Sequence, residues 1–257
     1  MTRLPHDSLG SGDPVVLLHA GVGDRRMWSD HLGWLADAGY RAIALDLPGF
    51  GEAPIDPGPQ APWEDVLQTL RDLGLNSAAL VGNSFGAAVA LRVAAVAPAA
   101  VRALMLVSPP PLDADPSPTL SAAWEAEEEA VRRGDIDAAV AAVLDAWLQP
   151  EAPADLRERV AAMQRRALEL QTAAGDVPGA PDPLEAHPEV LETLPMPVLT
   201  TAGEADMPDF KLGAAEIAGL VPDGRVEIIE GAGHLAPLEA PQEFRRLLLA
   251  FLKSSDL

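Results

Sequence analysis

A serine in a glycine-flanked turn is the feature of this sequence that most directly suggests chemistry. Gly82-Asn83-Ser84-Phe85-Gly86 fits the pattern G-x-S-x-G and lies between an apolar run, Ala78–Val81, and an alanine-rich segment typical of a helix. Such a turn raises the serine hydroxyl clear of a sheet, and only small residues fit two positions to either side. It also aims the N–H of Phe85, at a helix N-terminus, towards a developing oxyanion. We therefore predict that Ser84 is a nucleophile.

A serine hydroxyl needs a base within hydrogen-bond reach, and histidine suits that task near neutral pH. His234 lies in Gly231-Ala232-Gly233-His234, directly after the apolar run Val226–Ile229, where a glycine-rich loop can carry an imidazole over a strand end. His19 ends another apolar run and is expected to hold the next loop by hydrogen bonds. Surface positions are expected for His6, His31 and His187. His234 is therefore the predicted general base.

An acidic side chain is expected to orient that imidazole and to stabilise the imidazolium that forms during reaction. Asp206 follows the apolar run Val198–Thr201 and precedes His234, so the chain order is nucleophile, acid, histidine. We predict that Asp206 is this acid. The alternatives are Glu204, Asp209 and Asp113.

A second N–H for the oxyanion is expected from the loop His19-Ala20-Gly21-Val22-Gly23. Its small residues let the backbone approach a substrate oxygen, and Gly21 is the predicted donor, with Val22 as second choice. The loop contains G-x-G, but it lacks the further glycine and the lysine of a phosphate-binding loop. A dinucleotide site is therefore not predicted.

Short apolar runs separated by helical patterns indicate the framework that positions these loops. Most of the runs are apolar throughout, which is typical of strands covered by helices on both faces. Alternation of strand and helix predicts an α/β fold with a mostly parallel sheet. The predicted strands are Val15–His19, Ala42–Leu45, Ala78–Val81, Leu104–Val107, Val198–Thr201 and Val226–Ile229, and the predicted helices are Met27–Ala38, Pro62–Leu73, Phe85–Ala97, Lys211–Leu220 and one that begins at Pro241.

The middle of the chain interrupts this alternation. Residues 112–195 contain no strand candidate, and apolar stripes at helical spacing run from Ile136 to Trp147 and from Leu156 to Leu170. A helical insertion between two parallel strands predicts a cap over the carboxyl edge of the sheet, where ligands bind in open α/β folds. The expected division is a core of residues 1–111 and 196–257, with residues 112–195 as an all-helical cap (lid).

The composition excludes several classes of function. Lys and Arg number 18 against 39 Asp and Glu, so the net charge is −21, which argues against binding to nucleic acids and anionic membranes. There are no cysteines, so disulfides and thiolate metal sites are impossible. The N-terminal residues do not fit a signal peptide, and no apolar stretch is long enough to span a bilayer. A cytoplasmic protein is expected, and its oligomeric state is left open.

These motifs resemble those of the α/β-hydrolase superfamily, and in particular its small, lid-bearing, esterase-like serine hydrolases. The resemblance covers nearly the whole chain and includes the loop His19–Gly23, the run from Asp46 to Gly51, the Ser84 turn, the Asp206 loop and Gly231–His234. It implies a mostly parallel sheet flanked by helices, a helical lid and no cofactor.

Three departures from the family pattern, and the identity of the nucleophile, narrow this resemblance. Ala20 stands where the family usually has glycine, and Glu52-Ala53 stand where it often has a small polar residue. The short segment before Val15 implies that one or both leading strands are missing or very short. A serine nucleophile disfavours the dehalogenase and epoxide-hydrolase relatives, which use a carboxylate.

The expected reaction is hydrolysis of a small to medium carboxylic ester or lactone through an acyl-enzyme on Ser84. Two other functions remain open: another reaction of the same triad, such as hydroxynitrile lyase or perhydrolase-like chemistry, and ligand binding with little turnover. Arg132 and Arg133 could meet a substrate carboxylate, although exposed arginines at a helix end are more often solvated. Apolar residues beside the loops or in the cap suggest a pocket, or simply pack the core: Val22, Met27, Trp28, Trp124, Trp147, Met207 and Leu235.

Overall fold

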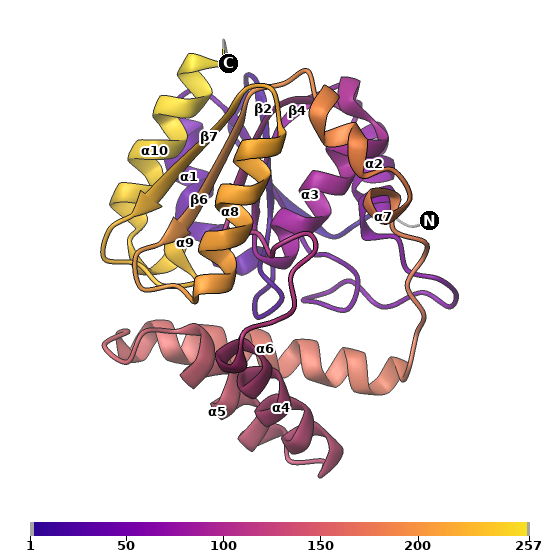
Figure 1. The fold of residues 1–257 in the computed structure, drawn as a ribbon, viewed down its shortest axis with the longest axis vertical. Coiled ribbons are helices and arrows are strands. Elements are labelled where there is room, and N and C mark those ends of the chain that lie inside the picture. Colours follow the sequence, from indigo (N-terminus) through magenta and orange to yellow (C-terminus); the bar gives the residue numbers. More distant parts are fainter. Residues whose placement is uncertain (1–2, 256–257) are drawn as a thin grey trace.

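The computed structural model describes residues 3–255 and contains a seven-stranded sheet between two layers of helices (Figure 1). The strand order is β1-β3-β2-β4-β5-β6-β7, and only β1 runs antiparallel to its neighbour. All six predicted strands are confirmed, with ends that shift by at most three residues. The strands are β1 His6–Leu9, β2 Pro14–Leu18, β3 Arg41–Leu45, β4 Ala78–Asn83, β5 Val101–Val107, β6 Val198–Gly203 and β7 Gly224–Ile229.

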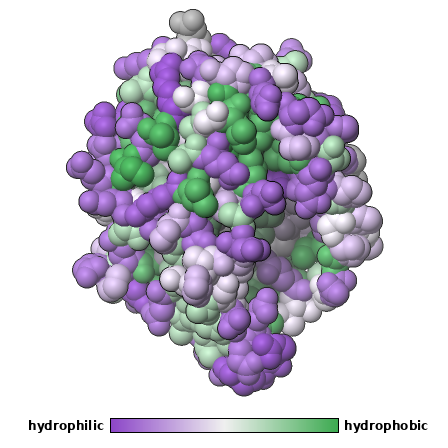
Figure 2. Space-filling view, viewed as in Figure 1, coloured by the Kyte–Doolittle hydropathy of each residue, from purple (hydrophilic) through white to green (hydrophobic). Residues whose placement is uncertain are grey.

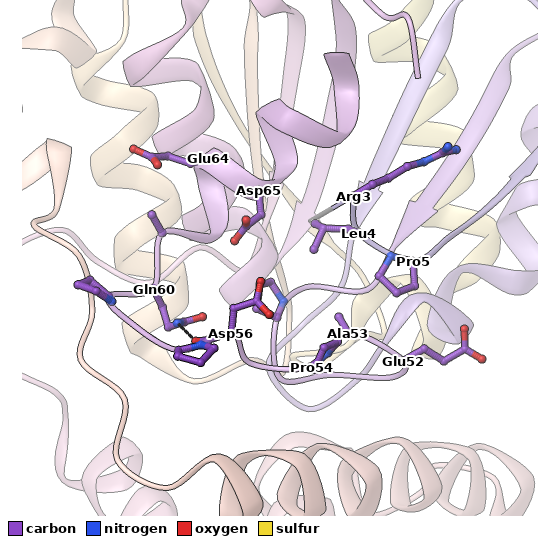
Figure 3. Close-up of a pocket in the computed structure, with 14 residues that line it drawn as sticks. Arg3, Leu4, Pro5, Glu52, Ala53, Pro54, Asp56, Gln60, Glu64 and Asp65 are labelled. Carbon is purple, nitrogen blue, oxygen red and sulfur yellow. Dashed lines mark hydrogen bonds between the residues drawn. The ribbon is translucent and has the colours of Figure 1, made fainter. Parts of the chain in front are cut away.

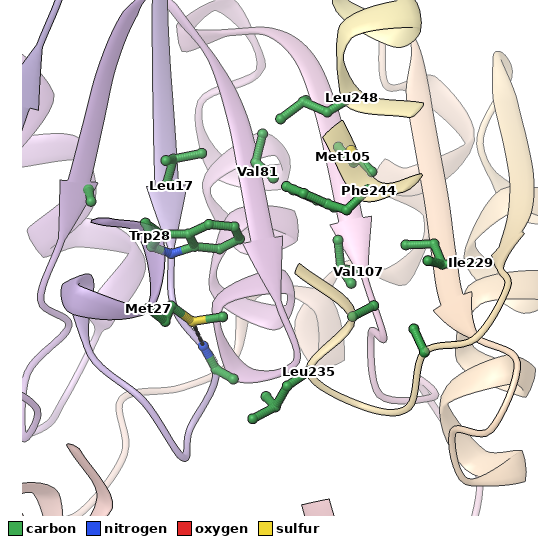
Figure 4. Close-up of a cluster of buried hydrophobic side chains, with 14 of the residues drawn as sticks. Leu17, Met27, Trp28, Val81, Met105, Val107, Ile229, Leu235, Phe244 and Leu248 are labelled. Atoms are coloured by element: carbon green, nitrogen blue, oxygen red, sulfur yellow. Dashed lines mark hydrogen bonds between the residues drawn. The ribbon is translucent and has the colours of Figure 1, made fainter. Parts of the chain in front are cut away.

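The apolar strands form two hydrophobic cores because successive side chains point to opposite faces of the sheet. Val15 and Leu17 of β2 face the first core, and Val16 and Leu18 face the second. The first core lies under helices α1 and α10 and is drawn in Figure 4. Helices α2, α3 and α8 cover the other face. The core helices and short turns are η1 Arg25–Trp28, α1 Ser29–Asp37, α2 Pro62–Asp72, α3 Phe85–Val96, η2 Pro98–Ala100, α8 Pro208–Leu220, α9 Ala236–Glu239 and α10 Pro241–Ser254.

One leading strand is present. β1 pairs antiparallel with β3, so that His6 lies opposite Leu45 and Leu9 lies opposite Ala42. This strand places the N-terminal segment at one edge of the sheet, and β7 forms the other edge. β1 has only four residues, which agrees with the expectation of a very short leading strand.

The segment between β5 and β6 is helical. Helices α4 Pro118–Arg132, α5 Ile136–Trp147 and α6 Ala154–Ala174 lie together beyond the carboxyl edge of the sheet (Figure 1), and we call them the cap helices. The short helices α7 Pro183–Ala186 and η3 Pro188–Thr193 return to the body of the molecule, where α7 packs against α3. The stripe on α6 is buried at Leu156, Val160, Met163 and Ala167.

Polar contacts join the cap helices to the sheet-bearing part. Asp209 of α8 accepts hydrogen bonds from the N–H and the hydroxyl of Ser117, both at 2.7 Å, where the chain enters α4. Arg166 of α6 donates to the carbonyl oxygen of Gly51 at 3.1 Å. The surface is hollowed between the two parts on the face drawn in Figure 2. Among the residues that the structure describes, no helix is long and apolar enough to cross a membrane.

Candidate active site

The Ser84 turn has the strained backbone that the G-x-S-x-G motif predicts. Ser84 lies between β4 and α3 with φ 53° and ψ −112°, in a region that residues other than glycine rarely adopt. A Cβ atom on Gly82 would overlap the carbonyl group of Gly86, and one on Gly86 would overlap the carbonyl oxygen of Leu18. The two glycines are therefore needed for the turn to form against β2. The Ser84 N–H is held by the carbonyl oxygen of Val107 at 2.8 Å.

The loop after β2 lies directly beside this turn. A Cβ atom built on Gly21 would be 3.5 Å from the Cβ of Phe85, which brings the two predicted oxyanion donors to one place. His19 holds the loop, as expected: its Nδ1 bonds the carbonyl oxygen of Ala20 at 2.8 Å, and its Nε2 accepts from the Leu47 N–H at 2.9 Å. Burial lowers the pKa of His19, so the imidazole is neutral with its proton on Nδ1.

Asp206 and His234 form a buried pair at the ends of β6 and β7. Asp206 Oδ1 accepts a hydrogen bond from His234 Nδ1 at 3.0 Å, and both residues are 5% exposed. The Met207 N–H donates to the same oxygen at 2.8 Å. Their loops are also joined, because the Ala205 N–H donates to the carbonyl oxygen of Ala232 at 2.8 Å. This geometry leaves Nε2 of the imidazole as the nitrogen available to accept a proton.

Asn83 connects the histidine loop to the serine turn. Its side-chain Nδ2 donates to the carbonyl oxygen of His234 at 3.2 Å and to that of Val107 at 3.3 Å. Asn83 is fully buried and immediately precedes Ser84, so this bond joins segments 151 residues apart. The chain thus brings the Ser84 turn and the His234 loop to the same edge of the sheet.

Two aromatic rings pack on the imidazole of His234. The ring centroid of Trp147, at the end of cap helix α5, lies 4.5 Å from that of His234. The ring of Phe210 in α8 lies 4.2 Å away. The two aromatic rings are 5.8 Å apart at a steep angle. His234 is therefore held on one side by a carboxylate and on others by rings from α8 and from the cap.

Comparison with known proteins agrees with this architecture. A model of the Alpha/beta hydrolase family matches residues 15–247. The chain belongs to the α/β hydrolase family.

Relatives of this α/β hydrolase include enzymes of several named activities. It is 26% identical to 2-hydroxy-6-oxo-6-phenylhexa-2,4-dienoate hydrolase of Comamonas testosteroni, over 96% of this chain and 90% of that protein. A thermophilic esterase from Thermogutta terrifontis superposes with a TM-score of 0.80 at 25% identity, covering 98% of this chain and 93% of that one. An enol-lactonase from Burkholderia xenovorans LB400 shares the fold, with a TM-score of 0.78, 20% identity and coverage of 97% and 96%.

Most of the candidate pocket residues of this α/β hydrolase are buried in the first hydrophobic core. Met27, Trp28 and Leu235 belong to the first hydrophobic core, and each is at most 1% exposed (Figure 4). The sulfur of Met27 instead lies 3.4 Å from the Ala20 N–H. Val22 is buried in the same core, Met207 packs at its margin, and Trp124 is 45% exposed on α4. Trp147 reaches the site, but as a ring packed on His234.

The other candidates for acid and base have different partners. Asp113 is exposed, and Glu204 is exposed with its Oε2 accepting from the Gly231 N–H at 3.2 Å. Asp209 bonds Ser117, as described above. His31, for which the surface was predicted, is instead 1% exposed, and its imidazole bonds the carbonyl oxygen of Pro237 at 3.0 Å. That prediction was wrong because α1 turns this polar residue towards α9 and α10.

Two cavities differ in their relation to the site. One of about 390 Å³ is lined by the N-terminal segment, the loop after Glu52 and the start of α2, and carries the carboxylates of Asp56, Glu64 and Asp65 (Figure 3). None of the triad candidates lines it. A second, of about 320 Å³, is lined by Phe85 together with Trp63, Ala88 and the run Pro109–Leu112, and it is mainly apolar. The second cavity is the one that adjoins the Ser84 turn.

Several residues of the site were not predicted from the sequence. Asn83 occupies a variable position of the G-x-S-x-G motif, and Phe210 and Glu239 lie in the helices that follow the acid and histidine loops. Gln149 follows cap helix α5, and its N–H donates to Glu239 Oε1 at 2.9 Å. For Glu239, the sequence signal was its position five residues after His234, which brings a carboxylate close to the histidine loop if the chain turns there.

Proposed function

We propose that this protein is a serine hydrolase that cleaves a small to medium carboxylic ester or lactone through an acyl-enzyme on Ser84. The observation that carries the proposal is the buried Asp206–His234 hydrogen bond of 3.0 Å, which Asn83 ties to the strained Ser84 turn. Strained backbone at a nucleophile and a carboxylate-bound histidine are the parts that acyl transfer requires. Membership of the α/β hydrolase family agrees with it.

The reaction would proceed in two steps. The Ser84 oxygen forms a bond to the substrate carbonyl carbon while His234 Nε2 takes its proton, and the N–H groups of Phe85 and Gly21 stabilise the oxyanion. The imidazolium, stabilised by Asp206, gives the proton to the leaving oxygen as the C–O bond breaks. Water then gives a proton to His234 as its oxygen attacks the acyl carbon. His234 returns that proton to the Ser84 oxygen as the acyl C–O bond breaks, which releases the carboxylic acid and restores both residues.

The apolar cavity beside Phe85 supports a substrate of modest size. Its volume of about 320 Å³ is at the lower end of the range for small-molecule sites. Its wall is mainly apolar, from Trp63, Ala88 and the prolines after β5, and would accept an acyl or alcohol group without charge. We propose this cavity as the subsite for that group.

A substrate with its own carboxylate is less well supported. Arg132 and Arg133, which could have bound such a group, both pair with Glu129 at the exposed end of α4. Arg92, which lines the apolar cavity, is paired with Asp182. An uncharged ester or lactone therefore fits these pairings better than an acidic one.

The decisive experiment combines a chemical probe with one substitution. A fluorophosphonate should label the parent enzyme and leave Ser84→Ala unlabelled, because only an activated serine attacks the phosphorus. Hydrolysis of p-nitrophenyl esters should fall by roughly 10⁶-fold in Ser84→Ala. Ser84→Ala with more than a tenth of the parent activity would refute the proposal, and an unlabelled parent would favour ligand binding.

A further inference from the structure

A second carboxylate, that of Glu239, lies beside the histidine loop. Glu239 ends the short helix α9, and its Oε2 accepts a hydrogen bond from the Gly233 N–H at 2.9 Å, one residue before His234. Its Oε1 accepts from the Gln149 N–H, also at 2.9 Å. Both oxygens accept from backbone donors, so these contacts favour the ionised form of the side chain.

Gln149 closes a ring of contacts between the cap and this loop. Its side-chain Nε2 donates to the carbonyl oxygen of Gly231 at 3.1 Å. A Cβ atom on Gly233 would lie 3.0 Å from Glu239 Oε2 and 3.1 Å from the Gln149 Cγ, so the loop fits closely between them. The backbone on the N-terminal side of His234 is therefore bonded to the cap twice, directly through Gln149 and indirectly through Glu239.

The same corner of the cap touches the imidazole itself. Trp147 lies two residues before Gln149, and its ring packs 4.5 Å from the His234 ring. Cap and histidine loop therefore meet at two levels, through the Trp147 ring on the imidazole and through the Gln149 amide on the backbone of Gly231. The segment that joins α5 to α6, which we call the α5–α6 corner, contains Gln149 and directly follows Trp147. A change in its position would alter both sets of contacts at once.

We propose that Glu239 is a positioning residue for His234, and that it joins the base to the cap through Gln149. The proposal rests on the proposed function, since it assigns Glu239 a task in proton transfer by His234. Glu239 would act in two ways. Its hydrogen bond to Gly233 holds the loop in the conformation that presents the imidazole. Its negative charge, with that of Asp206, favours the imidazolium that forms in the transition state.

Several charged groups surround Glu239 and His234 and bear on how the activity depends on pH. Burial raises the pKa of Glu239, while its three backbone hydrogen bonds and the charge of His234 oppose that rise. Asp206 bonds the imidazole of His234, and the charge of Glu239 also acts on it. Glu239 also lines a cavity of about 510 Å³ with charged side chains from α1 and from the α5–α6 corner, namely Asp30, Glu151, Asp155 and Arg159.

Glu239→Gln is the primary test, because the amide keeps the shape but removes the charge and one acceptor. With a p-nitrophenyl ester, kcat should fall by about tenfold while KM changes less than twofold, since substrate contacts are unaltered. The acid limb of the kcat/KM profile should move to lower pH by about half a unit, because a negative charge beside the imidazole is gone. A purely structural role would not move that limb.

The matched control is Glu127→Gln in cap helix α4. Glu127 is also half-buried, burial raises its pKa, and it accepts a hydrogen bond from a glutamine, Gln164, at 2.9 Å within the cap. This variant should keep the parent kcat and pH profile. Gln149→Ala is a second test, which removes the bond to Gly231 and should lower kcat by a few-fold with thermal stability near that of the control.

The outcomes separate this inference from the proposed function. In one outcome, Ser84→Ala is inactive and unlabelled, while Glu239→Gln keeps the parent kcat and the parent acid limb. That outcome would overturn the positioning role of Glu239 and leave the proposed function standing. An equal loss of kcat in Glu239→Gln and Glu127→Gln would also overturn the positioning role, because the effect would then belong to cap stability. Activity retained in Ser84→Ala would instead refute the proposed function.

Discussion

Protonation of His31 is expected to make this protein sensitive to mild acid. The imidazole is buried between the rings of Trp28 and Phe244, whose centroids lie 5.6 and 5.1 Å away. Its Nε2 bonds the carbonyl oxygen of Pro237, and its Nδ1 accepts from Arg245 Nε at 3.3 Å. A second proton on Nδ1 would face a guanidinium and lose this bond. Burial accordingly lowers the pKa of His31 to about 4.

The magnitude follows from the difference between the folded and the unfolded chain. An imidazole in the unfolded chain has a pKa of about 6.5, so between pH 6.5 and 4 the unfolded state binds the proton more readily. The folded state therefore loses stability as the pH falls through this window. From pH 7 to pH 5, with the folded pKa near 4, the loss at this one site is about 2 kcal/mol. Above pH 7 the site contributes no further change.

The assay is urea unfolding of the parent and of His31→Gln at pH 7 and pH 5. Glutamine can keep a donor to the carbonyl oxygen of Pro237 but cannot be charged, so this variant should lose about 2 kcal/mol less than the parent between the two pH values. His187→Gln, at an exposed histidine, is the control and should follow the parent. Parallel losses in the parent and in His31→Gln would show that His31 does not carry the acid sensitivity.

Three further predictions concern the site. Asp206→Asn should lower kcat by about 10⁴-fold on the same ester, because an amide misorients the imidazole; a loss below tenfold would point to another acid. Ser84→Gly should be about 1 kcal/mol more stable to urea than Ser84→Ala, since glycine adopts φ 53° without strain, and equal stability would mean that the turn is unstrained. Ala88→Trp should fill the cavity beside Phe85 and shift preference to shorter acyl chains; an unchanged preference would place the subsite elsewhere.

The strands and the candidate catalytic loops could be predicted because their signals are local. A parallel strand covered on both faces is apolar along most of its length, and β2 to β5 carry that pattern. The Ser84 turn needs small residues at fixed offsets, since the Gly82 and Gly86 positions are in contact with backbone. Chain order then predicts the acid and the base in the loops after β6 and β7. These loops contain the bonded pair Asp206 and His234.

The pocket could not be predicted, because sequence proximity to a loop does not give the direction of a side chain. Met27 and Trp28 follow the loop after β2 closely, yet their side chains turn into the first core. The cavity beside Phe85 is lined by α2, α3 and the prolines after β5, which come together only in three dimensions. His31 was misplaced for the same reason, since its partner Pro237 is 206 residues away.

Residues that bind backbone atoms leave little trace in the sequence. Asn83 and Glu239 act on the His234 loop through a carbonyl oxygen and an N–H, which every residue type provides. A search for matching side chains cannot find such partners. Their side-chain types are nevertheless informative, because an amide can donate to a carbonyl oxygen and a carboxylate can accept from two N–H groups.

Buried carboxylates give the acidic composition a structural role. Among residues 3–255, four aspartates are buried, and each accepts backbone N–H groups in a loop at the carboxyl edge of the sheet. Loops at this edge leave N–H groups that no strand can satisfy, and a carboxylate can accept several of them at once. Asp46, for example, accepts from the N–H groups of Arg25 and Glu52, both at 2.8 Å, and so joins the segments that follow β2 and β3. Part of the negative charge therefore holds loops at the carboxyl edge of the sheet in place.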